Sequence, residues 1–170
     1  MPIDSEQKVT VLGLGYIGLP TAALIARSGC KVTGVDVSRH VVDTVNSGKV
    51  HIEEVDLDGL VQGVVSRGTL VASTDVASAD TFVIAVPTPH DEEHRPDISH
   101  VHSAARPIAP KLLAGNLVIL ESTSPVGTTE RVAALLAELR PDLKVPGACT
   151  GAADIFVAYC PERVLPGRIL

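Results

Sequence analysis

The sequence is poor in aromatic side chains, with two tyrosines, two phenylalanines and no tryptophan among its 170 residues. A surface that stacks nucleic-acid bases needs aromatic rings, and one that follows phosphates needs clustered lysine and arginine. Here 14 basic residues are scattered among 20 acidic ones, for a net charge of −6. We therefore expect no nucleic-acid partner and a core built from Val, Leu, Ile and Ala.

Cysteine is also scarce, and Cys30, Cys149 and Cys160 are far apart with no CxxC spacing. This pattern argues against a disulfide framework and a zinc site, so we expect reduced thiols and no bound metal. No apolar run is long enough to span a bilayer. The segment Met1–Lys8 is polar and is not typical of a signal peptide. We expect a cytoplasmic protein without a membrane partner.

What the sequence does contain is an alternation of short apolar runs, rich in β-branched residues, with longer segments of helical period. Strands are predicted at Lys8–Leu12, Lys31–Val35, Leu70–Ala72, Thr81–Val86, Leu117–Glu121 and Ile155–Tyr159. Helices are predicted at Tyr16–Ser28, Ser38–Asn46, Leu57–Arg67, Ile98–Leu113 (interrupted by Pro107 and Pro110) and Thr128–Leu139. Apolar strands that are each followed by a helix indicate a parallel sheet covered on both faces. With right-handed crossovers, this predicts an α/β fold, a doubly wound parallel sheet (Rossmann fold), as a single domain over residues 1–170.

A glycine-rich motif joins the first predicted strand to the first predicted helix. Gly13, Gly15 and Gly18 fit the G-x-G-x-x-G spacing, with Tyr16 and Ile17 between the last two glycines. Gly13 permits the tight turn, Gly15 lets a diphosphate approach the backbone, and Gly18 lets the helix pack on the sheet. Free amides and the helix dipole then favour the negative charge. The alternative is a tight strand–helix turn without a ligand.

An acidic residue stands where a dinucleotide fold needs one. Asp36 lies eighteen residues after Gly18, at the end of the second predicted strand. A carboxylate there accepts hydrogen bonds from both hydroxyls of an adenosine ribose and repels a 2′-phosphate, which favours NAD over NADP. Arg39 is a counter-signal, because an arginine at this place can hold that phosphate.

Three loops follow the later predicted strands. They contain Thr88 between two prolines, the hydroxyl-rich run Glu121–Gly127, and the run Tyr159–Gly167. Ligands of open α/β sheets bind outside the carboxyl ends of the strands, so these loops should border one crevice.

Four short runs in these segments resemble those of a known protein family. The runs GLGYIGLP, VPTP, ESTSPVGT and AYCPERVLPG are similar to those of the UDP-glucose/GDP-mannose dehydrogenase family, and the similarity extends from about Lys8 to Leu170. Members oxidise the 6-hydroxymethyl group of a nucleotide sugar to a carboxylate, using two NAD and a thioester on a cysteine. The sequence Arg163–Gly167 favours the members that act on UDP-N-acetyl-D-mannosamine over those that act on UDP-glucose.

The resemblance also implies residue roles. Tyr16, Ile17, Asp36, Thr88 and Thr123 would contact NAD. Thr123 and Glu162 would hold a water and relay protons beside the reacting carbon, and Glu162, Arg163 and Val164 would touch the UDP-sugar substrate. A threonine hydroxyl can orient a water, and a nearby carboxylate can accept its proton.

The family's nucleophilic cysteine and its supporting lysine and asparagine would lie beyond Leu170. We therefore expect this piece to bind NAD without turnover, and to be monomeric or weakly associating although the whole enzyme is a homo-oligomer. Two alternatives stay open: a UDP-glucose or other UDP-sugar 6-dehydrogenase, and a non-catalytic NAD-binding module.

A zinc protease is a further alternative, because His90–His94 fits H-x-x-E-H. The motif needs both histidines on one helix, and Pro87, Pro89 and Pro96 around it disfavour a helix. A charged loop is the interpretation that we favour.

Overall fold

The computed structural model describes residues 7–89, 93 and 96–162. Four residues singled out above lie outside the described residues, namely His90, His94, Arg163 and Val164.

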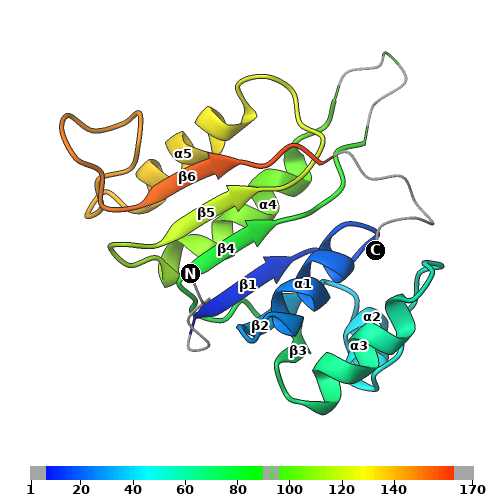
Figure 1. The fold of residues 1–170 in the computed structure, drawn as a ribbon. Helices are drawn as coiled ribbons and strands as arrows, with labels where there is room; N and C mark the ends of the chain where they lie inside the picture. Colours follow the sequence, from blue (N-terminus) through cyan, green and yellow to red (C-terminus); the bar gives the residue numbers. More distant parts are fainter. Residues whose placement is uncertain (1–6, 90–92, 94–95, 163–170) are drawn as a thin grey trace.

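In the described part of the chain, six parallel strands form one sheet in the order β3-β2-β1-β4-β5-β6 (Figure 1). The strands are β1 (Lys8–Leu12), β2 (Lys31–Val35), β3 (Leu70–Ser73), β4 (Thr81–Ile84), β5 (Leu117–Leu120) and β6 (Phe156–Tyr159). This confirms the predicted doubly wound fold. The order reverses between β1 and β4, and such a switch point is where ligands of open α/β sheets bind.

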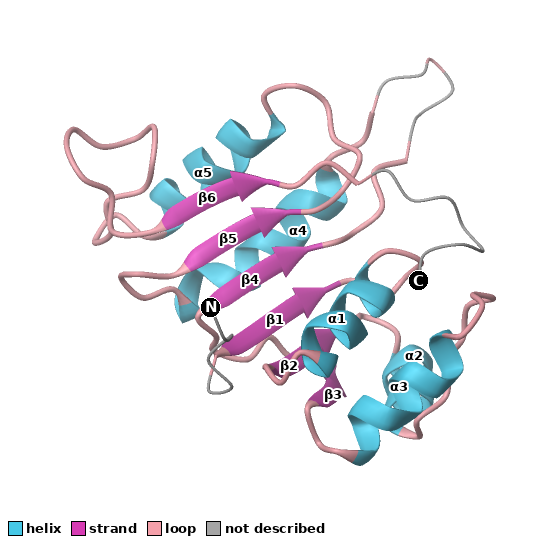
Figure 2. Ribbon diagram, viewed as in Figure 1, coloured by secondary structure: helices cyan, strands magenta, loops and turns pink. Residues whose placement is uncertain are grey.

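Helices cover both faces of the sheet (Figure 2). They are α1 (Gly18–Arg27), α2 (Arg39–Asn46), α3 (Leu57–Ser66), α4 (Ser99–Ile108), the 3-10 turn η1 (Ala109–Lys111) and α5 (Thr128–Leu139). The first three pack on one face and α4 and α5 on the other, each over its own apolar cluster. Neighbouring strand residues point to opposite faces, so Val11 enters the first cluster and Leu12 the second.

The helix boundaries follow local chemistry. Ser38 caps α2, with its hydroxyl accepting a hydrogen bond from the Val41 amide at 3.4 Å. The helix predicted from Tyr16 begins at Gly18 instead, so that Tyr16 and Ile17 belong to the turn. The helix predicted over Ile98–Leu113 is split into α4 and η1, the latter containing Pro110.

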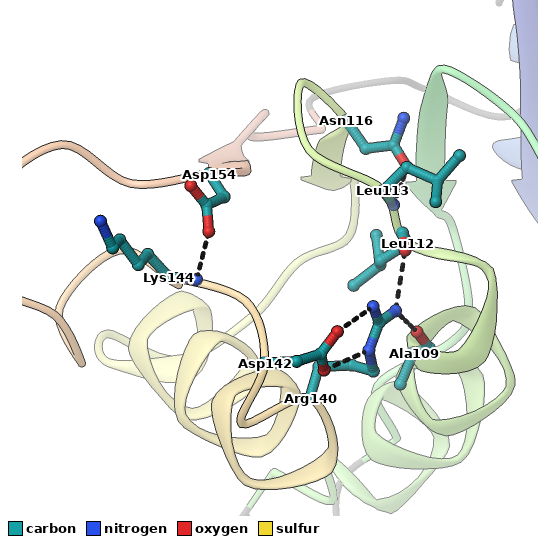
Figure 3. A network of polar contacts seen from close by, with 8 residues as sticks. All are labelled: Ala109, Leu112, Leu113, Asn116, Arg140, Asp142, Lys144 and Asp154. Carbon is teal, nitrogen blue, oxygen red and sulfur yellow. Dashed lines mark hydrogen bonds and ion pairs between the residues drawn. The ribbon is translucent and has the colours of Figure 1, made fainter.

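A polar network closes the amino-terminal edge of β5 and β6 (Figure 3). Both bonding faces of the Arg140 guanidinium are used: Nη1 donates to the carbonyls of Ala109 (2.8 Å) and Leu112 (2.7 Å). Nε and Nη2 bind the Asp142 carboxylate at 2.8 and 2.7 Å. These bonds hold the end of α5 against η1. They lie at the edge of the sheet opposite to the carboxyl ends of the strands, where a ligand would bind.

No helix among the described residues is long and apolar enough to cross a membrane. Within the same residues no group of three or more histidine, cysteine or acidic side chains could hold a metal ion.

Candidate dinucleotide-binding site

The glycine loop is held against the sheet by contacts that leave no room for side chains at two of its glycines. Gly13 has a φ of 92°, and its amide donates to the Val35 carbonyl at 2.8 Å. A Cβ on Gly13 would lie 2.5 Å from the carbonyl oxygen of Ala85, and one on Gly18 would lie 1.8 Å from that of Gly13. Both predicted packing roles are therefore visible in the structure.

Gly15 is different, because a Cβ there would meet nothing within 4 Å. The residue is exposed at the mouth of the loop. No side chain caps the amino terminus of α1 and no acidic residue lies in its first turn, so no residue of α1 itself offsets the positive end of the helix dipole. The loop therefore suits a diphosphate, whose negative charge this end of a helix attracts.

Asp36 joins the glycine loop to the start of α2. Its Oδ2 accepts a hydrogen bond from the Leu14 amide at 3.0 Å, and its Oδ1 accepts one from the Ser38 amide at 2.9 Å. Each carboxylate oxygen can accept two hydrogen bonds, so both keep a free lone pair for the two hydroxyls of a ribose.

A cleft of about 810 Å³ crosses the switch point of the sheet. Eight of the predicted site residues line it: Gly13, Gly15, Tyr16, Ile17, Asp36, Thr88, Thr123 and Glu162. Gly18 is buried beneath the loop, and Arg39 is exposed at the start of α2 without lining the cleft.

Hydrogen bonds connect the loops after β4, β5 and β6. The Thr88 hydroxyl donates to the Thr123 carbonyl, and the Thr123 hydroxyl donates to Oε2 of Glu162 at 3.4 Å. The structure thus brings together three side chains that lie up to 74 positions apart in the chain. In such a pair the hydroxyl can orient a water and the carboxylate can accept its proton.

The comparisons with known proteins agree with this geometry. Residues 7–170 match the model of the UDP-glucose/GDP-mannose dehydrogenase family, NAD-binding domain. The chain belongs to this family. The resemblance read from the sequence motifs is therefore confirmed, and NAD is the cofactor that the domain is built to take.

The relatives of this NAD-binding domain include dehydrogenases that are longer than the chain. The chain is 57% identical over 166 residues to the UDP-N-acetyl-D-mannosamine dehydrogenase of Yersinia pestis, covering 98% of the chain and 40% of the relative. It is 54% identical over 162 residues to the NDP-N-acetyl-D-galactosaminuronic acid dehydrogenase of Ralstonia nicotianae, covering 95% and 38%. The structure of the UDP-N-acetyl-mannosamine dehydrogenase of Staphylococcus aureus superposes with a TM-score of 0.84 at 41% identity, again covering 95% and 38%. The chain thus spans about 40% of the length of such relatives.

The NAD-binding domain has cleft residues that the sequence reasoning missed. Thr74 and Val76 line the cleft after β3, and His100, Ser103 and Pro107 line it from α4. The sequence predicted for Pro107 only an interruption of the helix. These residues carry no motif, because their relevance comes from tertiary packing, in which α4 lies against β4 and α5.

Glu121 also lines the cleft, and the sequence assigned it no individual role. It follows β5, and its Oε1 accepts a hydrogen bond from the Thr21 hydroxyl of α1 at 3.3 Å. Its Oε2 is buried and has no hydrogen-bond partner among the described residues. Burial raises the pKa of Glu121, and repulsion from Glu162 raises it further, whereas the Thr21 bond opposes the shift. The sequence analysis placed Glu121 at the end of a strand and at the start of a loop that borders the cleft, but gave it no role of its own.

Glu121 should make the ligand-free domain less stable at neutral than at acidic pH. Since its folded pKa is raised, its contribution is fully present below the ordinary value of 4.5 and is lost as the pH rises through the folded pKa. We expect Glu121→Gln to raise the free energy of unfolding at pH 7, by less than about 1 kcal/mol because water screens the partly exposed carboxyl. Urea denaturation from pH 4 to 8 measures this, and the gain should vanish at the acidic end. Glu138→Gln, at an exposed site of α5, is the control, and an equal gain in both variants would contradict the explanation.

Proposed function

We propose that the chain binds NAD in the cleft as the cofactor domain of a nucleotide-sugar dehydrogenase that oxidises UDP-N-acetyl-D-mannosamine at C6. The observation that carries the proposal is the convergence on one cleft of an unobstructed glycine loop, the Asp36 carboxylate and the linked side chains of Thr88, Thr123 and Glu162. The names of the relatives support this substrate class.

We propose a place along the cleft for each part of the dinucleotide. The diphosphate would lie over Gly13–Gly15, with the adenosine ribose on Asp36. The adenine would enter between the loop after β3 and α4, beside Val76 and Pro107. Tyr16, Ile17, Thr88 and Thr123 would then border the nicotinamide half. We also propose a preference for NAD over NADP, because the Asp36 charge repels a 2′-phosphate and Arg39 does not line the cleft.

NAD, when bound, accepts the hydride from the substrate carbon. The residues of this chain position the reactants and handle protons: the Thr123 hydroxyl orients a water, and the Glu162 carboxylate accepts its proton. We propose that Glu162, together with Arg163 and Val164, also touches the sugar. A protein of this kind would work in the cytoplasm, and this piece of it, a single domain over residues 1–170, would bind NAD without completing the oxidation.

The test of the cofactor role is Asp36→Ala. We expect the NAD affinity to fall by about tenfold or more, because two hydrogen bonds to a charged group are lost. Isothermal titration calorimetry measures this, with Asp43→Ala in α2, an exposed aspartate outside the cleft, as the matched control. An unchanged affinity in Asp36→Ala would count against the proposed binding mode.

A further inference from the structure

Glu121 has a feature that the packing of the domain does not explain. A buried carboxylate oxygen without a partner is unfavourable, and such atoms in native proteins are normally satisfied by protein, water or a ligand. Here Oε2 is buried and unpartnered among the described residues, while Oε1 is held by Thr21. Because the residue lines the cleft, a ligand that displaces the atoms covering Oε2 can supply the missing partner.

The position of Glu121 in the sheet identifies that occupant. The glycine loop and Asp36 receive the diphosphate and the adenosine ribose on the β1–β2 side of the switch point. Glu121 lies on the other side, after β5, with its amide bound to the Ile84 carbonyl at the end of β4 at 2.8 Å. A dinucleotide that spans the switch point places its second nucleoside over these strand ends.

We propose that Glu121 binds the nicotinamide ring of NAD, with Oε2 accepting a hydrogen bond from the ring's carboxamide group and the negative charge favouring the oxidised ring. This inference rests on the proposed function, since it assumes that the cleft takes NAD. The nicotinamide ring offers a hydrogen-bond donor in its carboxamide group, which ADP-ribose lacks. The ring carries a positive charge when oxidised and none when reduced, so a carboxylate in a partly water-excluded cleft discriminates between the two.

Thr21 acts as the positioning residue. It lies in α1, where its amide donates to the Ile17 carbonyl at 3.1 Å, so its hydroxyl is fixed by the same helix that follows the glycine loop. Its bond to Oε1 restrains the Glu121 side chain and turns the other oxygen to its buried, unpartnered position.

The test compares three ligands by calorimetry: NAD⁺, NADH and ADP-ribose, which lacks the nicotinamide. For Glu121→Gln we expect unchanged ADP-ribose affinity and about tenfold weaker NAD⁺ binding, because the charge-assisted interaction is lost. NADH should weaken by about threefold or less, since only a neutral hydrogen bond changes. Thr21→Val should shift the affinities in the same direction by a smaller factor. Glu138→Gln, which removes the same charge from an exposed site of α5, should change none of them.

The outcomes separate the two proposals. If the unaltered chain binds neither ADP-ribose nor NAD⁺, the proposed function fails and the role of Glu121 fails with it. If it binds both, but Glu121→Gln and Thr21→Val leave the ratio of NAD⁺ to NADH affinity unchanged, the role of Glu121 alone is overturned. An equal loss for all three ligands overturns it as well, because it would indicate a general disturbance of the cleft.

Discussion

Replacing Gly18 by alanine is expected to lower the free energy of unfolding by about 3 kcal/mol or more, the largest stability effect that we predict. The added Cβ would lie 1.8 Å from the Gly13 carbonyl oxygen and 3.2 Å from the Cβ of Ala85. The first neighbour is backbone in the tightest part of the glycine loop, so relief requires α1 to move away from β1. Since small domains have only about 5–15 kcal/mol of stability, this is a large fraction of the total.

Urea denaturation followed by circular dichroism measures the effect. Gly59→Ala is the matched control, because Gly59 lies in α3 with nothing within 4 Å of an added Cβ. This control should be neutral or slightly stabilising, since alanine is the better helix former. A Gly18→Ala midpoint equal to that of the unaltered chain would contradict the packing role of Gly18.

Replacing Gly15 by alanine is expected to have the opposite profile: normal stability and a loss of NAD affinity of about a hundredfold or more. The new methyl group meets no protein atom within 4 Å and therefore does not disturb the fold. It projects instead from the exposed part of the loop, where the diphosphate has to approach the backbone amides.

Calorimetry with NAD and with ADP-ribose tests this, because both ligands carry the diphosphate and should be weakened alike. Thermal unfolding of the same variant checks that the fold is intact. Gly63→Ala, in α3 away from the cleft, should bind both ligands normally. If Gly15→Ala keeps its affinity for both, the diphosphate does not lie on this loop.

Gly18 and Gly15 lie in one motif of six residues, but their substitutions are expected to change different quantities: the free energy of unfolding for Gly18 and the NAD affinity for Gly15. Gly13 and Gly18 serve the packing of loop, helix and sheet, whereas Gly15 has open space around it and is proposed to serve the ligand. Glu121 extends the same distinction, since an unpartnered carboxylate oxygen weakens the free domain and becomes useful only when a ligand is present. Ligand binding should therefore stabilise the folded domain through its affinity.

Much of the fold could be predicted, because strands buried on both faces are continuous apolar runs and each is followed by a helix of clear period. The least accurate predictions fall at element ends. The sequence predicts that Tyr16 and Ile17 are helical, but α1 begins at Gly18. It predicts that Glu121 is in a strand, but β5 ends at Leu120. Local sequence does not determine such ends, which depend on hydrogen bonds to distant residues.

By itself the sequence determined the parallel α/β architecture, the glycine loop, the acid at Asp36 and the family. Each of these was recognised from short patterns whose residues are close together in the chain. Only the tertiary structure decided that Arg39 stays outside the cleft, that α4 forms one of its walls, and that Glu121 reaches Thr21 with one oxygen left unpartnered. Those features arise where segments up to 100 positions apart pack side by side, and a contact of that range leaves no pattern in the local sequence.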